Sequence, residues 1–114
     1  MQESKLRDRS LDFAVQIINL VKYLKSKHET IISNQIGRSG TSIGANIREA
    51  QYAHGTADFI AKLQIALKEC SETEYWIELL LESGYYSNKT ILEKCVEVKK
   101  ILISSINTAK AKNE

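Results

Sequence analysis

The 114-residue sequence contains no proline and only five glycines. Proline and glycine are the residues that most often interrupt a helix, so their scarcity favours long and continuous helices. The regular alternation of apolar and polar residues that marks a half-buried strand is also missing, which disfavours a fold built on sheets. These absences together indicate an all-α protein.

Residues that bind metals are scarce as well. The sequence holds two cysteines, Cys70 and Cys95, and two histidines, His28 and His54, and none of them shows the spacing of a zinc site. We therefore expect no metal and no cofactor. Both cysteines fall within apolar periodic segments, which favours buried free thiols, with a disulfide between them as the alternative.

Long hydrophobic runs are absent too. No stretch approaches the ~18 apolar residues of a membrane-spanning helix, and the charged N-terminus lacks the apolar core of a signal peptide. We therefore expect a cytoplasmic protein without a membrane partner. The 16 basic and 14 acidic residues give a net charge of +2, which is too balanced to indicate nucleic-acid binding by itself.

Four segments carry apolar residues at helical spacing, and we expect helices over residues 6–27, 29–53, 57–83 and 88–110. The length suits one domain with one modest core, covering residues 1–114. Short connections make consecutive helices antiparallel neighbours, so the expected fold is an all-α, antiparallel up-down-up-down four-helix bundle. In the first segment the expected inner stripe is Leu11, Ala14, Ile18, Val21 and Leu24, widened by Phe13, Ile17 and Leu20.

Three glycines of the second segment, Gly37, Gly40 and Gly44, lie on one narrow strip of the expected helix, beside its isoleucine stripe. Each glycine costs about 1 kcal/mol relative to alanine inside a helix, so a compensating contact is needed. We predict that the flat strip lets another helix approach closely. The alternative is a helix that is broken by a loop near Gly37 to Gly40.

The third segment is apolar on two faces. Ile65, Trp76 and Leu79 lie roughly opposite its main inner stripe, and Tyr75 borders them. A helix with two apolar faces has more surface to bury than a lone four-helix bundle covers. We therefore expect these four residues to form a subunit interface. The alternative is that Trp76 is simply half-exposed.

Glu74 falls on the inner stripe of the third segment, where a buried carboxylate needs a partner. Asn46 and Arg48 of the second segment are the expected partners. We interpret the three residues as a buried polar tie between two helices, in preference to a catalytic acid.

Arg48 and His54 show the spacing R-x5-H. This spacing resembles the R-x(4–6)-H signature of the HEPN-type ribonucleases, in which the pair cleaves RNA. So short a motif also arises by chance. A HEPN-like ribonuclease using these two residues is therefore an alternative only, and we expect no enzyme activity.

Charged residues are unevenly distributed along the chain. Lys22, Lys25 and Lys27 gather near the end of the first segment and Arg38 lies in the second, whereas the third segment is acidic. We consider these four basic residues a candidate nucleic-acid-binding surface. An ordinary solvated face is the alternative, and charge alone favours that alternative.

Three stretches resemble one family. SIGANIREA (residues 42–50) resembles the S-I-P-A-N-I-x-E-G segment of the bacterial four-helix-bundle proteins that are encoded in 23S ribosomal RNA intervening sequences. IALKECSETE (residues 65–74) and ESGYYS (residues 82–87) resemble the I-A-L-x-S-x-x-E-x-E and L-G-Y-L-S segments of the same family. Arg38 matches an arginine that precedes the first segment, and the resemblance spans nearly the whole chain.

The sequence departs from the family pattern at four positions. Gly44 stands where the family has proline, and Ala50 stands where it has glycine. Gly37 and Gly40 stand where arginine and alanine are typical. The loss of one arginine weakens any nucleic-acid surface that is carried over from the family.

The resemblance implies a bundle that assembles as a ring-like homopentamer and has no catalytic activity. A related group, the accessory variability determinants of diversity-generating retroelements, binds nucleic acid and partners a reverse transcriptase. That group is strongly basic and this chain is not. We expect a non-enzymatic homo-oligomer, with five copies favoured, that acts as an RNA-associated or ribonucleoprotein accessory factor; a reverse transcriptase is a further partner to test. A protein–protein scaffold without a nucleic-acid role is the alternative.

Overall fold

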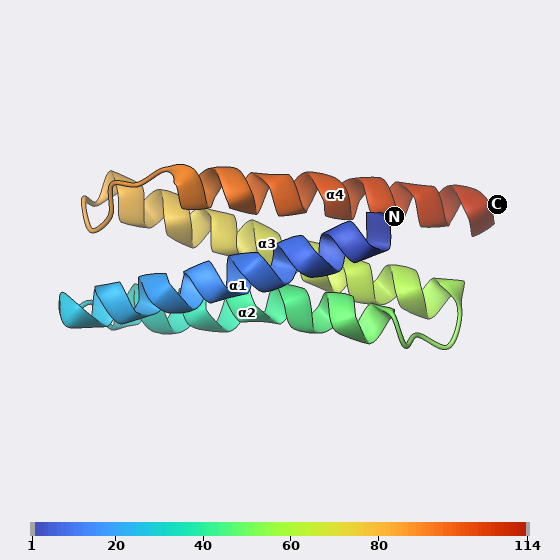
Figure 1. The fold of residues 1–114 in the computed structure, drawn as a ribbon, viewed down its shortest axis with the longest axis horizontal. Coiled ribbons are helices and arrows are strands. Elements are labelled where there is room, and N and C mark those ends of the chain that lie inside the picture. The colour runs from blue at the N-terminus through green and yellow to red at the C-terminus, as the bar shows by residue number, and fades with distance from the viewer. Residues whose placement is uncertain (1, 114) are drawn as a thin grey trace.

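The computed structural model describes residues 2–113 of the chain, with side chains over residues 5–112. The described residues form no strand and four helices: α1 (Gln2–Ser26), α2 (Ile31–Ala50), α3 (Thr56–Glu82) and α4 (Thr90–Asn113). Consecutive helices run antiparallel (Figure 1), and within this part of the chain each helix packs on its two neighbours and not on the helix diagonally opposite. The predicted four-helix bundle is therefore confirmed, and it measures 48 × 20 × 19 Å.

The inner face of α1 differs from the predicted stripe. Leu11 and Ile18, which helical spacing places inside, are 55% and 47% exposed. Phe13, Ile17 and Leu20, expected only to widen the stripe, are almost fully buried instead. Apolar residues cover so much of the circumference of α1 that spacing alone cannot select the side that faces the core. The consequence is an apolar stripe on the outside of the bundle.

α2 runs without interruption through its three glycines, so the alternative of a broken helix is wrong. A Cβ atom on Gly40 would lie 2.8 Å from the side chain of Ile17 in α1, and Cβ atoms on Gly37 and Gly44 would also meet α1, at 3.4 and 3.5 Å. The predicted helix-contact strip is confirmed, and its partner is α1 of the same chain. Because α1 covers the strip, the strip is not available for contact with a second copy.

The turn between α1 and α2 is built by a positive backbone angle and a carboxylate cap. His28 has a φ of 64°, in the left-handed region, where the chain reverses. The Glu29 carboxylate then accepts hydrogen bonds from the backbone N–H groups of the first three residues of α2, at 3.1, 3.0 and 2.8 Å. These donors have no partner within the helix, and the N-terminus of a helix favours a negative charge. The second helix therefore begins two residues later than the predicted start at 29.

The remaining turns fix the other helix ends. α3 ends before Gly84, whose φ of 82° is accessible to glycine at little cost. The side-chain oxygen of Asn88 accepts a hydrogen bond from the N–H of Thr90, at 2.9 Å, and so holds the α3–α4 loop against the start of α4. α2 ends at Ala50 and not at the predicted residue 53, because residues 51–53 form tighter turns that bond three residues back.

Candidate nucleic-acid interface

The three predicted lysines lie in the last turns of α1 and in the turn that follows it. Lys22, Lys25 and Lys27 are all exposed, and none of them forms an ion pair within residues 5–112. Cations near the C-terminus of a helix interact favourably with the helix dipole, which stabilises α1 and leaves the lysines able to bind an anion. The Lys27 ammonium lies 5.7 Å from the centre of the Tyr23 ring, within cation–π range. Three cations without acidic partners therefore gather at one end of the bundle.

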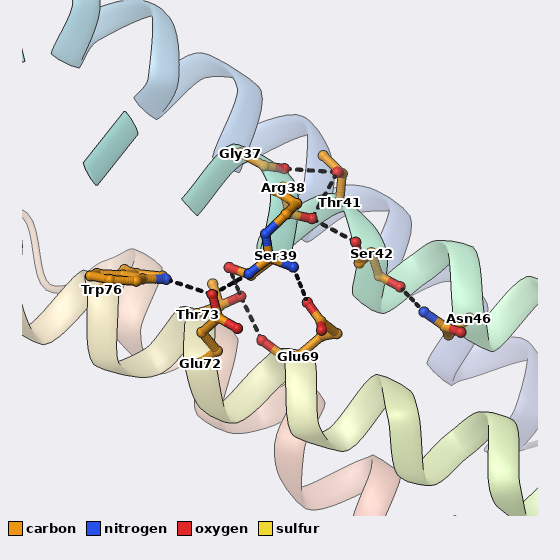
Figure 2. Close-up of polar contacts among 10 residues, drawn as sticks. All are labelled: Gly37, Arg38, Ser39, Thr41, Ser42, Asn46, Glu69, Glu72, Thr73 and Trp76. Carbon is orange, nitrogen blue, oxygen red and sulfur yellow. Dashed lines mark hydrogen bonds and ion pairs between the residues drawn. The ribbon is translucent and has the colours of Figure 1, made fainter. Parts of the chain in front are cut away.

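Arg38, the fourth predicted basic residue, is engaged in a polar network between α2 and α3 (Figure 2). Its guanidinium is ion-paired with Glu72 and, at 3.0 Å, with Glu69. The indole N–H of Trp76 donates to the same Glu72 carboxylate at 3.0 Å. The hydrogen bond from Trp76, and then the hydrogen bond and the charge of Arg38, hold the pKa of Glu72 below its usual value. Arg38 thus has two acidic partners, which the three lysines lack.

A groove lies beside the basic end of α1, between α1, the α3–α4 loop and the start of α4. Its volume is about 270 Å³. The Tyr23 and Tyr86 rings, which belong to α1 and the loop, meet edge to face there with their centroids 5.8 Å apart. The groove combines aromatic and amide side chains with an apolar floor: Gln16, Asn19, Leu20, Tyr23, Tyr86 and Ile91.

The path of α1 explains why the groove opens at this end. The N-terminal half of α1 is held to α4 by ion pairs from Arg9 to Glu97, at 2.7 Å, and from Lys94 to Asp12, at 3.8 Å. Toward its C-terminus α1 runs away from α4 (Figure 1), and the tyrosines fill part of the widening space. Sequence reasoning missed this groove because the loop tyrosine and the lysines are far apart along the chain and meet only after folding.

The residues of α3 that were predicted to form a subunit interface lie at its surface. Ile65 and Tyr75 are 43% and 56% exposed. Trp76 and Leu79 are half-buried, and the Trp76 ring meets the Tyr75 ring edge to face at 5.1 Å. The structure therefore leaves apolar surface on this outer side of α3, although Trp76 also bonds within the subunit.

A second apolar face lies on the outside of α1. Leu11, Val15 and Ile18 follow one another at helical spacing and are 55%, 51% and 47% exposed. Because α1 and α3 occupy diagonal positions in the bundle, the two outer faces point to opposite sides. Sequence reasoning missed this face because it assigned two of the three residues to the core.

The predicted tie of Glu74 to α2 is wrong. Its carboxylate instead accepts a hydrogen bond from the ammonium of Lys99 in α4, at 2.7 Å, and its side chain is 20% exposed. The Asn46 amide donates to the Ser42 carbonyl of its own helix (Figure 2), at 2.9 Å, and Arg48 is exposed. Helical spacing places a residue near the core but does not say which of two flanking helices it meets.

Two hydroxyls make the buried polar contact between α2 and α3. The Thr73 hydroxyl donates to the Ser39 hydroxyl oxygen at 2.8 Å (Figure 2), and both residues are fully buried. Small hydroxyl side chains let the two helices pack closely while each polar atom keeps a partner. Nothing in the sequence distinguishes these two residues from other serines and threonines.

Arg48 and His54 do not form a pair. Arg48 lies in the last turn of α2 and His54 in the following loop, both are exposed, and no hydrogen bond or ion pair joins them in the described part of the chain. The backbone N–H of His54 donates to the Asp58 carboxylate at 3.2 Å. The geometry therefore gives the ribonuclease alternative no support.

Cys70 and Cys95 are buried free thiols, as the sequence predicts, with their sulfur atoms 3.8 Å apart. Their mutual hydrogen bond, followed by burial, raises the pKa of Cys95. Over the residues that the structure describes, no three cysteine, histidine or carboxylate side chains gather in a way that could hold a metal ion. None of the four helices, over the same residues, is long and apolar enough to cross a membrane.

The fold and the surface define an antiparallel four-helix bundle with a basic end beside a groove. Residues 2–104 match the protein family described as 23S rRNA-intervening sequence protein. The chain belongs to this family, as its sequence motifs indicate. Among solved structures it is similar to a protein of unknown function from the S23 ribosomal protein family of Bacteroides thetaiotaomicron VPI-5482. That similarity has 51% identity and a TM-score of 0.91, and covers 94% of this chain and 99% of the other. No curated protein matches the chain.

Proposed function

We propose that this protein is a non-enzymatic, homo-oligomeric bundle that associates with RNA, as an accessory factor of an RNA or a ribonucleoprotein. The proposal rests chiefly on the basic end of α1, where Lys22, Lys25 and Lys27 are exposed and have no acidic partner among the described residues. Free cations of this kind bind phosphates with little regard to sequence. Membership of an rRNA-related family supports RNA as the polyanion.

Copies of the chain assemble, in this proposal, through the outer faces of α1 and α3. Each face exposes apolar side chains that the subunit does not cover, such as Val15 and Ile18 on α1 and Tyr75 on α3. Because the faces point to opposite sides, the contact joins two different surfaces of successive copies, and such a contact forms a ring when the rotation closes. The resemblance to the intervening-sequence family favours five copies. A ring repeats the three lysines of each subunit around one rim, which offsets the low net charge of a single chain.

The test is a titration of fluorescently labelled RNA at low salt. Changing Lys22, Lys25 and Lys27 together to glutamate is expected to weaken binding by at least about tenfold, since phosphate contacts supply most of the affinity. A matched control changes Lys100, Lys110 and Lys112 of α4 to glutamate, which alters the net charge equally and is expected to leave binding largely intact. Equal losses in the two variants would contradict a localised basic surface.

A protein–protein scaffold is the second candidate function. The exposed apolar stripe of Leu11, Val15 and Ile18 favours it, because such surface is typical of protein interfaces. The same titration separates the two functions. Wild-type protein that binds no RNA at low salt would support the scaffold and contradict the proposal.

A further inference from the structure

We propose that the groove beside the basic end of α1 binds one unpaired base of a single-stranded RNA, with the flanking lysines on the neighbouring phosphates. This inference rests on the proposed association with RNA and narrows it to single strands. Aromatic rings, amide groups with unused hydrogen-bonding atoms, and cations come together at this groove. Each of these three features matches a different part of a nucleotide.

The size and lining of the groove suit one flat base. Its volume of about 270 Å³ falls just below the range typical of drug-sized ligands, so it fits a ring system with little attached. Leu20 and Ile91 form an apolar floor and are 3% and 4% exposed. Tyr23 and Tyr86 supply aromatic surface at the wall. A base laid against these rings stacks, and stacking tolerates any base because every base has a π-face.

Amide groups supply hydrogen-bond donors and acceptors for the edge of a base. Asn19 is exposed, and its side-chain amide makes no hydrogen bond within residues 5–112. Gln16 uses its NH₂ group to donate to Asp12, and its carbonyl oxygen has no partner among the described residues. Asn88 uses its oxygen to cap α4, and its NH₂ group has no partner in the same part of the chain. Single-stranded RNA exposes the base edges that such groups recognise.

Cations flank the groove on two sides. On the α1 side, the Lys27 ammonium lies over the Tyr23 ring. Lys89 follows the loop asparagine on the opposite side and is also exposed without an ion pair in the described part of the chain. Of the nearby carboxylates, Asp12 is paired with Lys94. A backbone that crosses the groove therefore passes a cation before and after the bound base.

A base in a duplex cannot bind in the groove in this way, because its hydrogen-bonding edge is occupied by its partner and its two faces by the neighbouring bases. The protein is therefore expected to bind single-stranded RNA more tightly than a duplex of the same sequence. An oligonucleotide that lacks bases keeps the phosphate contacts alone. Comparing the affinities for these three ligands separates the contribution of base binding in the groove from the contribution of phosphate binding by the lysines.

The experiment measures fluorescence anisotropy at 50 mM salt with three ligands of about 12 nucleotides: single-stranded RNA, its duplex and an abasic strand. The double variant Tyr23→Leu and Tyr86→Leu, which keeps apolar bulk, is expected to lose roughly tenfold in affinity for the single strand, as stacking of one base contributes. It should lose little for the abasic strand. Asn19→Ala is also expected to weaken binding of the single strand more than binding of the abasic strand. Tyr52→Leu is the matched control, since Tyr52 is 80% exposed and lies outside the groove.

Photo-crosslinking of wild-type protein to RNA that carries 5-bromouridine gives a readout independent of any variant's folding. Crosslinks that mass spectrometry maps to the peptides of Tyr23 or Tyr86 support the inference. Equal affinity for the single and abasic strands, or crosslinks found only elsewhere, would overturn the groove while leaving RNA association intact. A wild-type protein that binds none of the three ligands overturns both the groove and the proposed function.

Discussion

The α2–α3 side of the bundle and the end where α1 leaves α4 use their polar side chains in opposite ways. Between α2 and α3, Arg38 is paired with Glu69 and Glu72, and small buried hydroxyls hold the helices together. At the end of α1, Lys27 has no acidic partner and Asn19 no hydrogen bond in the described part of the chain. Polar groups that already have partners stabilise the packing, and groups without partners are free to bind a ligand.

Neighbouring helices also differ in how closely they pack. α1 approaches α2 so closely at Gly40 that an added Cβ atom would clash with Ile17. The pairing of α1 with α4 is looser, and it leaves the groove at the end where the ion pairs stop. A close contact leaves no space for a ligand, whereas a divergent pair of helices does. The location of the groove is thus a consequence of how the helices pack.

The largest expected effect concerns the exposed outer face of α1 (Leu11, Val15 and Ile18), which belongs to neither of the two regions compared above. Changing Val15 and Ile18 to glutamate is expected to dissociate the oligomer completely, because an interface does not tolerate uncompensated buried charges. Light scattering at micromolar concentration is expected to show a multiple of the 12.9 kDa chain for the wild type and a single chain for the variant. Ile103→Glu, on the 42% exposed Ile103 of α4, is the control and is expected to stay assembled. A monomeric wild type would contradict the proposed assembly.

The next effect tests how close the approach of α1 to α2 is. Gly40→Ala is expected to lower the free energy of unfolding by about 1–3 kcal/mol, because the new methyl group overpacks against Ile17. At Gly44 the added methyl group meets ordinary contacts from 3.5 Å, so Gly44→Ala is expected to be neutral or to stabilise by up to about 1 kcal/mol. Urea denaturation measures both. Equal changes in the free energy of unfolding for the two variants would contradict an especially close contact between α1 and α2 at Gly40.

A smaller effect separates the buried hydroxyl contact between Thr73 and Ser39 from the partly exposed ion pair between Glu74 and Lys99. Thr73→Val removes a hydroxyl without changing the shape of the side chain and is expected to cost about 1–2 kcal/mol, since it strands the Ser39 hydroxyl. Glu74→Ala is expected to cost less than about 1 kcal/mol, because its partner Lys99 retains access to water. The midpoints of chemical denaturation give the comparison. The opposite ranking would restore Glu74 as the main polar tie.

The smallest effect is a dependence of stability on pH. The pKa of Glu72 is lowered in the folded chain, so its contribution to stability is present above the ordinary carboxyl pKa and is lost as pH falls through the folded pKa. Glu72→Gln is expected to flatten this acid loss by a few tenths of a kcal/mol, because the pair is partly exposed. Thermal melts between neutral and acidic pH measure it, with Glu78→Gln as an exposed control. If the wild type and both variants lost stability equally with falling pH, Glu72 would not be a source of the acid loss.

The sequence predicts the fold well because the fold depends on features that are local. Absence of proline and helical spacing predict the four helices, and the glycine strip predicts a close helix contact, here confirmed at Gly40. Glu29 illustrates the limit at the helix ends. Its acidic side chain fits either a first helical residue or a cap, and only the turn at His28 makes it a cap.

The candidate site is less predictable because it depends on which neighbour each side chain meets. Spacing brings Glu74 near the core, but only packing shows that it faces α4. Spacing groups the three lysines, but it does not reveal that Arg38 is paired across the helix interface. The Tyr86 ring reaches Tyr23 through a loop whose path no local pattern encodes.

The central claim is that the free lysine end of α1 binds RNA phosphates, and the most direct measurement is the salt dependence of that binding. If about six phosphates are neutralised, the affinity is expected to fall on the order of 10³-fold as salt rises from 50 to 200 mM. The variant with Lys22, Lys25 and Lys27 changed to glutamate should show a shallower dependence, because fewer counterions are released. Binding that is insensitive to salt, or a slope that the three substitutions leave unchanged, would contradict the claim.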